Sequence, residues 1–228
     1  MPPLATLPST FPRLSGVVYT TLLNHRPQLA ALGDAVHAAP YKAPPQHPVL
    51  GVKPRNTLAA DGDALVVPAG FDAVGIGASL GLVVGRTACR VSADEALSFL
   101  AGYVLVNEVS LPRESHYRPA VRFMARDGYC PVGATVVPTS DVTAPDDLGV
   151  RVWIDGVLVR HTTTGDRVRP VAALLADVTA FMTLQPGDVL TLGAAADAPL
   201  ARVGQTVEIE IDGLGRLHHP VVAEGSVA

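Results

Sequence analysis

Short apolar segments, punctuated by Gly, Pro and Asp, run along most of the chain from residue 49 onward. This pattern predicts strands over residues 16–24, 64–68, 79–84, 150–154, 157–160, 189–192 and 206–211. The dipeptide Asp155-Gly156 between two such segments predicts a two-residue β-hairpin turn. Helices are expected over residues 27–38, 92–100 and 168–181, the second beginning with a capping box of Ser92 and Glu95. Because strands outnumber helices and do not alternate with them regularly, a mixed α/β, β-dominated fold is expected.

The chain divides at residue 48 on this pattern. Residues 1–48 are expected to hold an N-terminal arm, a strand, a helix and a proline-rich connection, and residues 49–228 one strand-rich domain. With 48% hydrophobic residues in 228, the chain can bury a core without metals or disulfides. Cys89 and Cys130 form no metal or redox spacing and are expected to be buried thiols.

Charge and hydropathy exclude some classes of partner. The formal net charge is −4, which argues against a nucleic-acid surface. The longest apolar run, residues 73–85, is too short and too rich in glycine to span a bilayer. The N-terminus has no continuous apolar core of a secretory signal. A cytoplasmic protein without nucleic-acid or membrane partners is therefore expected.

Residues 102–133 concentrate polar and charged side chains between two strand-like segments. Because an arginine binds carboxylates bidentately and stays charged, the arginines indicate an anionic ligand. A solvated loop with local ion pairs is the alternative. The stretch contains Glu108, Ser110, Arg113, Glu114, Tyr117, Arg118, Arg122, Arg126 and Asp127.

Residues 77–81 spell G-x-S-x-G, the nucleophile elbow of α/β hydrolases. That motif needs a helix after the serine, whereas residues 82–87 are typical of a strand, so a glycine-bounded core strand is favoured. A dinucleotide-binding turn fails for the same reason. The histidines show no metal-ligand spacing, and His218 and His219 are expected to point to opposite faces of a strand.

Several segments together resemble the fumarylacetoacetate hydrolase superfamily. They are KPRNT at residues 53–57, GYVLVNEVS at 102–110, RDGYCPVG at 126–133, MTLQPGDVL at 182–190 and VEIEIDGLGRLHHPV at 207–221. The set covers most of the chain in the superfamily's order. The resemblance implies a β-roll with a few short helices.

A narrower set, KAPP at residues 42–45 with NEVSLPRES at 107–115 and YRP at 117–119, is similar to the N-terminal half or subunit of the bifunctional isomerase/decarboxylases of 4-hydroxyphenylacetate (homoprotocatechuate) degradation. That resemblance implies decarboxylation of 5-oxopent-3-ene-1,2,5-tricarboxylate and isomerisation of 2-hydroxyhepta-2,4-diene-1,7-dioate. The ligand implied is a small dicarboxylate or tricarboxylate 2-oxo acid.

The chain departs from the superfamily's pattern at its chemical positions. Active members bind Mg²⁺ or Mn²⁺ through two glutamates and an aspartate, and these positions align with Gly77, Ser79 and Glu108. The acid/base pair aligns with Gln28 and Ala31, a lysine with Met124, and the substrate loop with residues 193–198. No metal is therefore expected in this chain, with Glu108 as the only ligand at most. Mg²⁺ or Mn²⁺ is expected in a partner subunit.

Three hypotheses follow. The first is a subunit of the isomerase/decarboxylase, beside a metal-bearing paralogue of the C-terminal type or in a homodimer. The second is a non-catalytic scaffold or ligand-binding paralogue that stabilises such a partner, and the third an autonomous enzyme with an unconventional metal-free site. An autonomous hydrolase is disfavoured, because no residue is evident that would activate water. In an active chain Glu108 would be the acid/base group, and the substrate-binding residues would be Arg118, Arg122, Arg126, Asp127, Lys53, Thr163 and Thr164.

Overall fold

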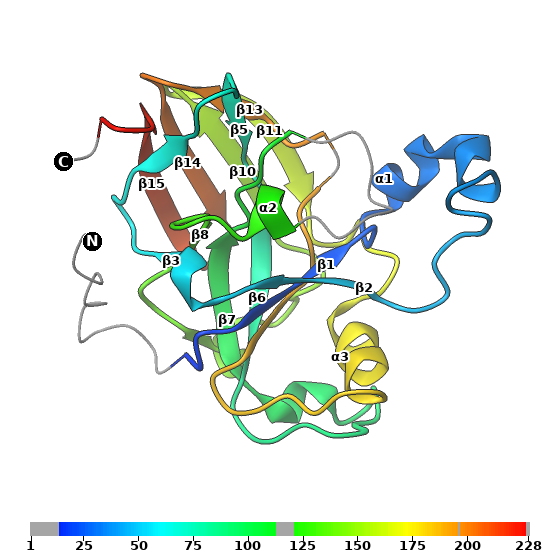
Figure 1. Ribbon diagram of the computed structural model, residues 1–228. Coiled ribbons are helices and arrows are strands. Elements are labelled where there is room, and N and C mark those ends of the chain that lie inside the picture. The colour runs from blue at the N-terminus through cyan, green and yellow to red at the C-terminus, as the bar shows by residue number, and fades with distance from the viewer. Residues whose placement is uncertain (1–13, 113–120, 196, 227–228) are drawn as a thin grey trace.

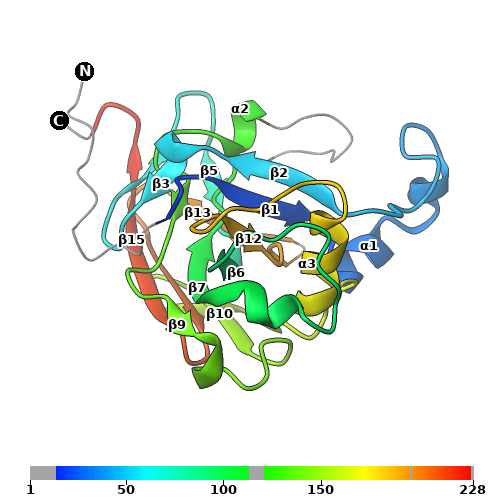
Figure 2. The same ribbon diagram turned by 90° about the horizontal axis from the view of Figure 1, so that it is seen from below.

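Two β-sheets enclose a common core in the computed structural model, which describes residues 14–112, 121–195 and 197–226 (Figure 1). Buried aliphatic residues of both sheets, such as Leu80, Leu105, Val152 and Ile209, belong to one continuous apolar cluster. Seen from below, the strands surround this interior (Figure 2). The β-dominated fold expected from the sequence is confirmed.

The larger sheet has six strands, in the order β2-β1-β12-β6-β7-β9. Strands β1 and β12 are parallel and the other neighbours antiparallel. The strand expected near the N-terminus is therefore an interior strand of this sheet, between β2 and β12. The boundary proposed after residue 48 stays a prediction. The strands are β1 (Val18–Leu22), β2 (Val49–Lys53), β6 (Ala78–Val84), β7 (Leu100–Asn107), β9 (Val137–Pro138) and β12 (Val189–Thr191).

The smaller sheet has five strands in the order β11-β10-β14-β15-β4, and two strand pairs, β13 with β5 and β3 with β8, complete the described part of the chain. The hairpin between β10 and β11 turns at Asp155 and Gly156, whose φ angles of 51° and 76° are those of the predicted tight turn. The strands are β3 (Leu58–Ala59), β4 (Leu65–Val67), β5 (Ala73–Gly75), β8 (Cys130–Pro131), β10 (Gly149–Ile154), β11 (Val157–Thr163), β13 (Leu200–Arg202), β14 (Thr206–Ile211) and β15 (Gly215–Ala223).

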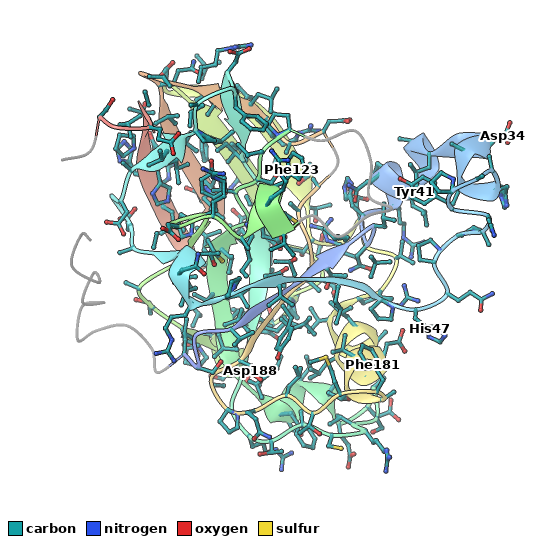
Figure 3. The ribbon with its side chains drawn as sticks, viewed as in Figure 1. Asp34, Tyr41, His47, Phe123, Phe181 and Asp188 are labelled. Atoms are coloured by element: carbon teal, nitrogen blue, oxygen red, sulfur yellow. The ribbon has the colours of Figure 1, made fainter. Side chains whose placement is uncertain are left out.

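The helices are shorter than the sequence predicted. The first is divided into α1 (Arg26–Ala31) and the 3₁₀ helix η1 (Gly33–His37), because Gly33 has a φ of +48° that an α-helix cannot contain. This segment projects from the sheets on one side (Figure 1), and Figure 3 shows Asp34 on it and Tyr41 in the turn that follows. The remaining helical segments are the 3₁₀ helices η2 (Arg55–Thr57), η3 (Ala96–Phe99) and η4 (Thr139–Asp141), and the α-helices α2 (Val121–Met124) and α3 (Val171–Thr179).

The helix predicted over residues 92–100 is wrong. Ser92 Oγ does contact Glu95 Oε2 at 3.1 Å, but only η3 follows, and β7 begins at Leu100. A local cap cannot extend a helix where the chain must enter the central sheet. No helix of the described residues is long and apolar enough to cross a bilayer.

Three further expectations concern single residues. Ser79 is the second residue of β6, all seven residues of which are buried, so the serine of the G-x-S-x-G motif lies in a core strand. His219 is buried and His218 exposed, as their alternation on β15 predicted. Cys130 is buried, but the prediction for Cys89 is wrong: it is exposed, because it lies in the turn region after β6 rather than in the core.

Candidate functional site

A cavity of about 410 Å³ lies where β1 and β7 end, against α1 and the loop after β12. Its wall combines segments from four distant parts of the sequence. The lining residues are Thr21, Leu22, Gln28, Ala31, Leu32, Gly75, Gly77, Glu108, Ser110, Leu111, Pro112, Met124, Ala194, Ala195, Asp197, Ala198 and Leu200. Among these described residues the ionisable side chains are Glu108 and Asp197. The cavity is large enough for a small organic acid.

Glu108 is the buried carboxyl group of this cavity, with 6% of its surface exposed. It directly follows β7, and its backbone N–H donates to Gly77 O at 2.8 Å. The Thr191 hydroxyl donates to Glu108 Oε1 at 2.6 Å. Burial raises the pKa of this carboxyl, while the hydroxyls of Thr191 and Ser79 and the cations Lys53 and Arg167 lower it. The net shift is upward, so Glu108 holds its proton more firmly than an exposed glutamate.

The residues around Glu108 do not fit a divalent metal ion. The described residues contain no group of three or more His, Cys, Asp or Glu side chains that could hold one. A Cβ atom at Gly77 would lie 2.7 Å from Glu108 O and 3.0 Å from Ala194 Cβ, so the backbone leaves no room for a side chain there. Mg²⁺ requires near-octahedral oxygen coordination, which one hydrogen-bonded carboxyl does not provide.

The other positions at which the sequence departs from the superfamily also surround this cavity. Gln28 and Ala31 line it from α1 and Met124 from α2, and the loop after β12 contributes Ala194, Ala195 and Ala198. The alignment of segments thus predicted which residues come together. The side chains that they bring are mostly small, apolar or uncharged.

Lys53 is fully buried and does not line the cavity. Its ammonium group donates to the carbonyl oxygens of Val109, Met124 and Tyr129 at 2.5, 2.6 and 2.8 Å. These three bonds match the three N–H donors of an ammonium group. Lys53 therefore joins β2 to the ends of β7 and α2, and the predicted contact with substrate has no support in this geometry.

Thr163 and Thr164 likewise hold a turn rather than line the cavity. The Thr164 hydroxyl donates to Pro145 O and accepts from Leu148 N, both at 2.8 Å. Thr163 Oγ1 accepts a hydrogen bond from Gly165 N at 3.2 Å. Both hydroxyls are thus used near the end of β11, and substrate binding by these residues stays a prediction.

The predicted anion-binding residues are also outside the described lining. Arg118 lies outside the described residues. Arg122 is exposed on α2, with its guanidinium carbon 5.2 Å from the centre of the Phe123 ring, and Figure 3 labels Phe123. Arg126 faces Glu224 at 3.8 Å, and Asp127 accepts a bond from Asn56 Nδ2 at 2.7 Å. Substrate binding by these residues stays a prediction.

The sequence analysis missed Arg167, which is 2% exposed and among the largest fully buried side chains of the described residues. It follows Asp166 and precedes Val168, and Arg169 lies two positions further on. Arg169 pairs with Asp177 Oδ2 at 2.7 Å and Gln46 O at 2.6 Å. Nothing in the local pattern separates the buried arginine from the paired one, because their burial depends on distant segments.

The fold and the cavity define a class: a two-sheet β domain with a pocket for a small molecule at the strand ends. Residues 17–222 match the family model described as fumarylacetoacetate (FAA) hydrolase C-terminal. The chain belongs to the fumarylacetoacetate hydrolase family.

Relatives within and around this family narrow the comparison. The chain is 43% identical, over 215 residues, to the 4-hydroxyphenylacetate degradation bifunctional isomerase/decarboxylase of Salmonella dublin; this match covers 94% of the chain and 49% of that protein. The chain thus spans about half the length of that relative. A crystal structure is known of 2-hydroxyhepta-2,4-diene-1,7-dioate isomerase from Mycobacterium marinum, whose sequence is 28% identical to this chain. The two structures superpose with a TM-score of 0.74, and the match covers 94% of this chain and 77% of the isomerase chain.

A third comparison concerns the fold alone. The fumarylpyruvate hydrolase of Pseudomonas aeruginosa, solved in complex with Mn²⁺ and pyruvate, is 21% identical, with a TM-score of 0.78 over 97% of this chain and 94% of the other. A divalent metal therefore occurs within this fold.

Proposed function

We propose that this chain is a cytoplasmic subunit of the 2-hydroxyhepta-2,4-diene-1,7-dioate isomerase / 5-oxopent-3-ene-1,2,5-tricarboxylate decarboxylase of 4-hydroxyphenylacetate catabolism. The observation that carries the proposal is a cavity of about 410 Å³ containing one buried carboxyl, Glu108. Similarity to isomerase/decarboxylases of twice this length supports a partner with the same fold. That partner would carry the Mg²⁺ or Mn²⁺.

Tautomerisation is the reaction that the residues of this chain can support. It transfers one proton from an enol oxygen to a carbon atom and needs no activated water. A carboxyl group that gives a proton and afterwards takes one back is sufficient for this exchange. Glu108 has the raised pKa that suits the donor form, and Thr191 orients it through the 2.6 Å bond.

A second function has its own support. The cavity is lined largely by alanine, glycine and leucine. Two of the superfamily's three metal positions are occupied by Gly77 and Ser79, and its acid/base positions by Gln28 and Ala31. This composition favours a ligand-binding or scaffold paralogue that stabilises an active partner. The two functions differ in whether Glu108 transfers a proton.

A spectrophotometric assay of the purified chain on 2-hydroxyhepta-2,4-diene-1,7-dioate, in EDTA and with added Mg²⁺, tests the proposal. The expected result is turnover when a metal-bearing paralogue is added, reduced at least about tenfold when this chain carries Glu108→Gln. Equal rates with the wild-type chain and with Glu108→Gln would leave only the scaffold function. No stimulation of the paralogue by this chain would contradict both.

A further inference from the structure

Arg167 carries a buried charge that the described part of the chain leaves unpaired. Its Nε and Nη1 atoms are buried and have no hydrogen-bond partner, and it forms no ion pair with a described carboxylate. Such a group is costly, because an unpaired buried charge loses its hydration without compensation. An unsatisfied guanidinium in an otherwise well-packed core therefore needs an explanation.

Backbone hydrogen bonds place Arg167 next to segments that form the cavity wall. Its backbone bridges to His25 in antiparallel fashion. On either side, Arg26 N donates to Asp166 O at 2.9 Å and Val168 N to Asn24 O at 2.8 Å. Arg167 thus lies beside the turn that joins β1, with Thr21 and Leu22 of the cavity wall, to α1.

The same turn is joined to the loop on the other side of the cavity. Asn24 Nδ2 donates to Leu192 O at 3.0 Å, and Ala194 and Ala195 of the wall follow two and three residues later. Thr191, directly before Leu192, holds Glu108. A short network of hydrogen bonds therefore connects the Arg167 segment with the carboxyl of the cavity.

The charges around Arg167 favour an anion. Burial lowers the pKa of Arg167, and the opposing influences are Glu108 first and Asp166 second. Asp166 is exposed, and Glu108 is buried and holds its proton firmly. Burial and the charge of Arg167 lower the pKa of the nearby His25, so this histidine is less readily protonated. Positive charge at this end of the cavity is thus not neutralised by close contact within the described residues.

A second buried donor is available beside the cavity. Asn107 Oδ1 accepts a bond from Gly77 N at 3.1 Å, and Gly77 lines the cavity. Asn107 Nδ2 is buried and has no hydrogen-bond partner. Guanidinium and amide N–H groups are the donors that bind a carboxylate and an adjacent carbonyl oxygen.

We propose that Arg167 is a substrate-binding residue, which receives the carboxylate of a 2-oxo acid in this cavity without a metal ion. Gly77 and Ser79 stand where metal-binding glutamates were expected, so this chain lacks the positive charge of a metal ion. The guanidinium supplies a positive charge in its place. Since Nε and Nη1 hold no hydrogen bonds, turning the guanidinium toward the cavity breaks none at these atoms. The loop after β12 contributes the small side chains of Ala194 and Ala195 to the cavity wall. The inference deepens the proposed function by assigning a residue to the anionic end of its substrate.

Oxalate is a suitable probe, because its two adjacent carboxyl groups imitate the planar end of a 2-oxo acid and it needs no turnover. Titration calorimetry would be performed in EDTA on the wild-type chain and on Arg167→Met, Arg167→Lys and Arg169→Met. Arg169→Met is the matched control, since that arginine lies in the same segment but is already paired with Asp177. Melting curves of all four proteins would confirm that they are folded.

Wild-type chain is expected to bind oxalate in EDTA, and Arg167→Met to weaken the binding at least about tenfold. Arg167→Lys, which keeps the charge but not the fork of donors, should lie between the two, and Arg169→Met should bind as the wild type does. Equal affinity of wild type and Arg167→Met, or no binding of oxalate by the wild type, would overturn the inference. If Arg167→Met does not fold, a wild-type affinity of Arg167→Gln would overturn it equally. Because no partner is present, the result is independent of the assay of the proposed function.

Discussion

At the scale of the residue, buried cations serve two different purposes in this protein. Lys53 is surrounded by three carbonyl oxygens, each at 2.8 Å or less, whereas Arg167 leaves two donor atoms without partners. A satisfied buried charge stabilises the structure that surrounds it, and an unsatisfied one is tolerated at a cost. The first residue is therefore assigned to the fold and the second to the ligand, and two measurements of stability separate these roles.

Lys53→Met should lower the free energy of unfolding by about 3 kcal/mol, because it leaves three buried carbonyl oxygens without donors. Urea denaturation measures this change, and Lys53→Arg, too large for the same position, should be destabilising as well. A Lys53→Met variant with unchanged stability and weakened oxalate binding would instead return Lys53 to the substrate-binding residues.

Arg167→Met, unlike Lys53→Met, should stabilise the protein. It should raise the free energy of unfolding by about 1–3 kcal/mol, because it removes an uncompensated buried charge and keeps most of the side-chain volume. Arg169→Met, which breaks the contacts with Asp177 and Gln46, should not stabilise. The same urea titrations test both variants. A marked loss of stability in Arg167→Met would show that the guanidinium has a structural partner.

At the scale of the element, the junction between β6 and the end of β7 decides which chemistry the cavity can contain. Gly77 directly precedes β6, and the backbone N–H of Glu108 donates a hydrogen bond to Gly77 O at 2.8 Å. An approach this close is available only to a residue without a Cβ atom. The same contact that positions Glu108 therefore excludes a glutamate at residue 77.

Gly77→Ala should destabilise the protein by about 1–3 kcal/mol, because its Cβ atom would lie 2.7 Å from Glu108 O. Gly133→Ala is the matched control, since a Cβ atom there would meet its nearest neighbour, Leu105 O, at an ordinary 3.5 Å. Thermal unfolding of the two variants gives the comparison. Equal melting temperatures would show that the β6–β7 junction can open, and a metal-binding glutamate at residue 77 would then be feasible.

At the scale of the whole molecule, packing of the two sheets and their connections places histidines where they remain neutral. His219 on β15 is fully buried, and its Nδ1 lies 2.9 Å from Asp63 O, in the connection between β3 and β4. Burial lowers its pKa below the usual 6.5, against the raising influence of Asp63 and Asp61. His25, beside the cavity, is shifted in the same direction. Protonation is therefore linked to unfolding of the core.

The stability of the protein should fall as the pH is lowered from about 7.5 to 5.5, because the unfolded chain binds protons at histidines that the folded chain keeps neutral. The contribution is complete above the unfolded pKa of 6.5 and is lost below it, toward the lower folded pKa. Urea denaturation at several pH values measures the slope, which His219→Gln should reduce. An unchanged slope in His219→Gln would mean that His219 is accessible to protons in the folded chain.

The sequence by itself determined the local structure and the order of the family's segments. The hairpin at Asp155 and Gly156, the strand predicted over residues 79–84 and the β-dominated class follow from neighbouring residues, whose preferences act over a few bonds. It also determined that Gly77, Gln28, Ala31 and Met124 would stand where chemical groups were expected. The helix over residues 92–100 failed because a tertiary requirement, entry into β7, outweighed a local cap.

Only the tertiary structure decided which charges are buried and what they meet. Lys53 contacts carbonyl oxygens up to 76 positions away, and the wall beside Arg167 comes from residues more than 140 positions before it and from residues beyond 190. Two arginines in one short segment, Arg167 and Arg169, have different surroundings for this reason. The burial and the electrostatic environment of a side chain depend on all atoms near it in space. A sequence pattern predicts them only where those atoms belong to neighbouring residues.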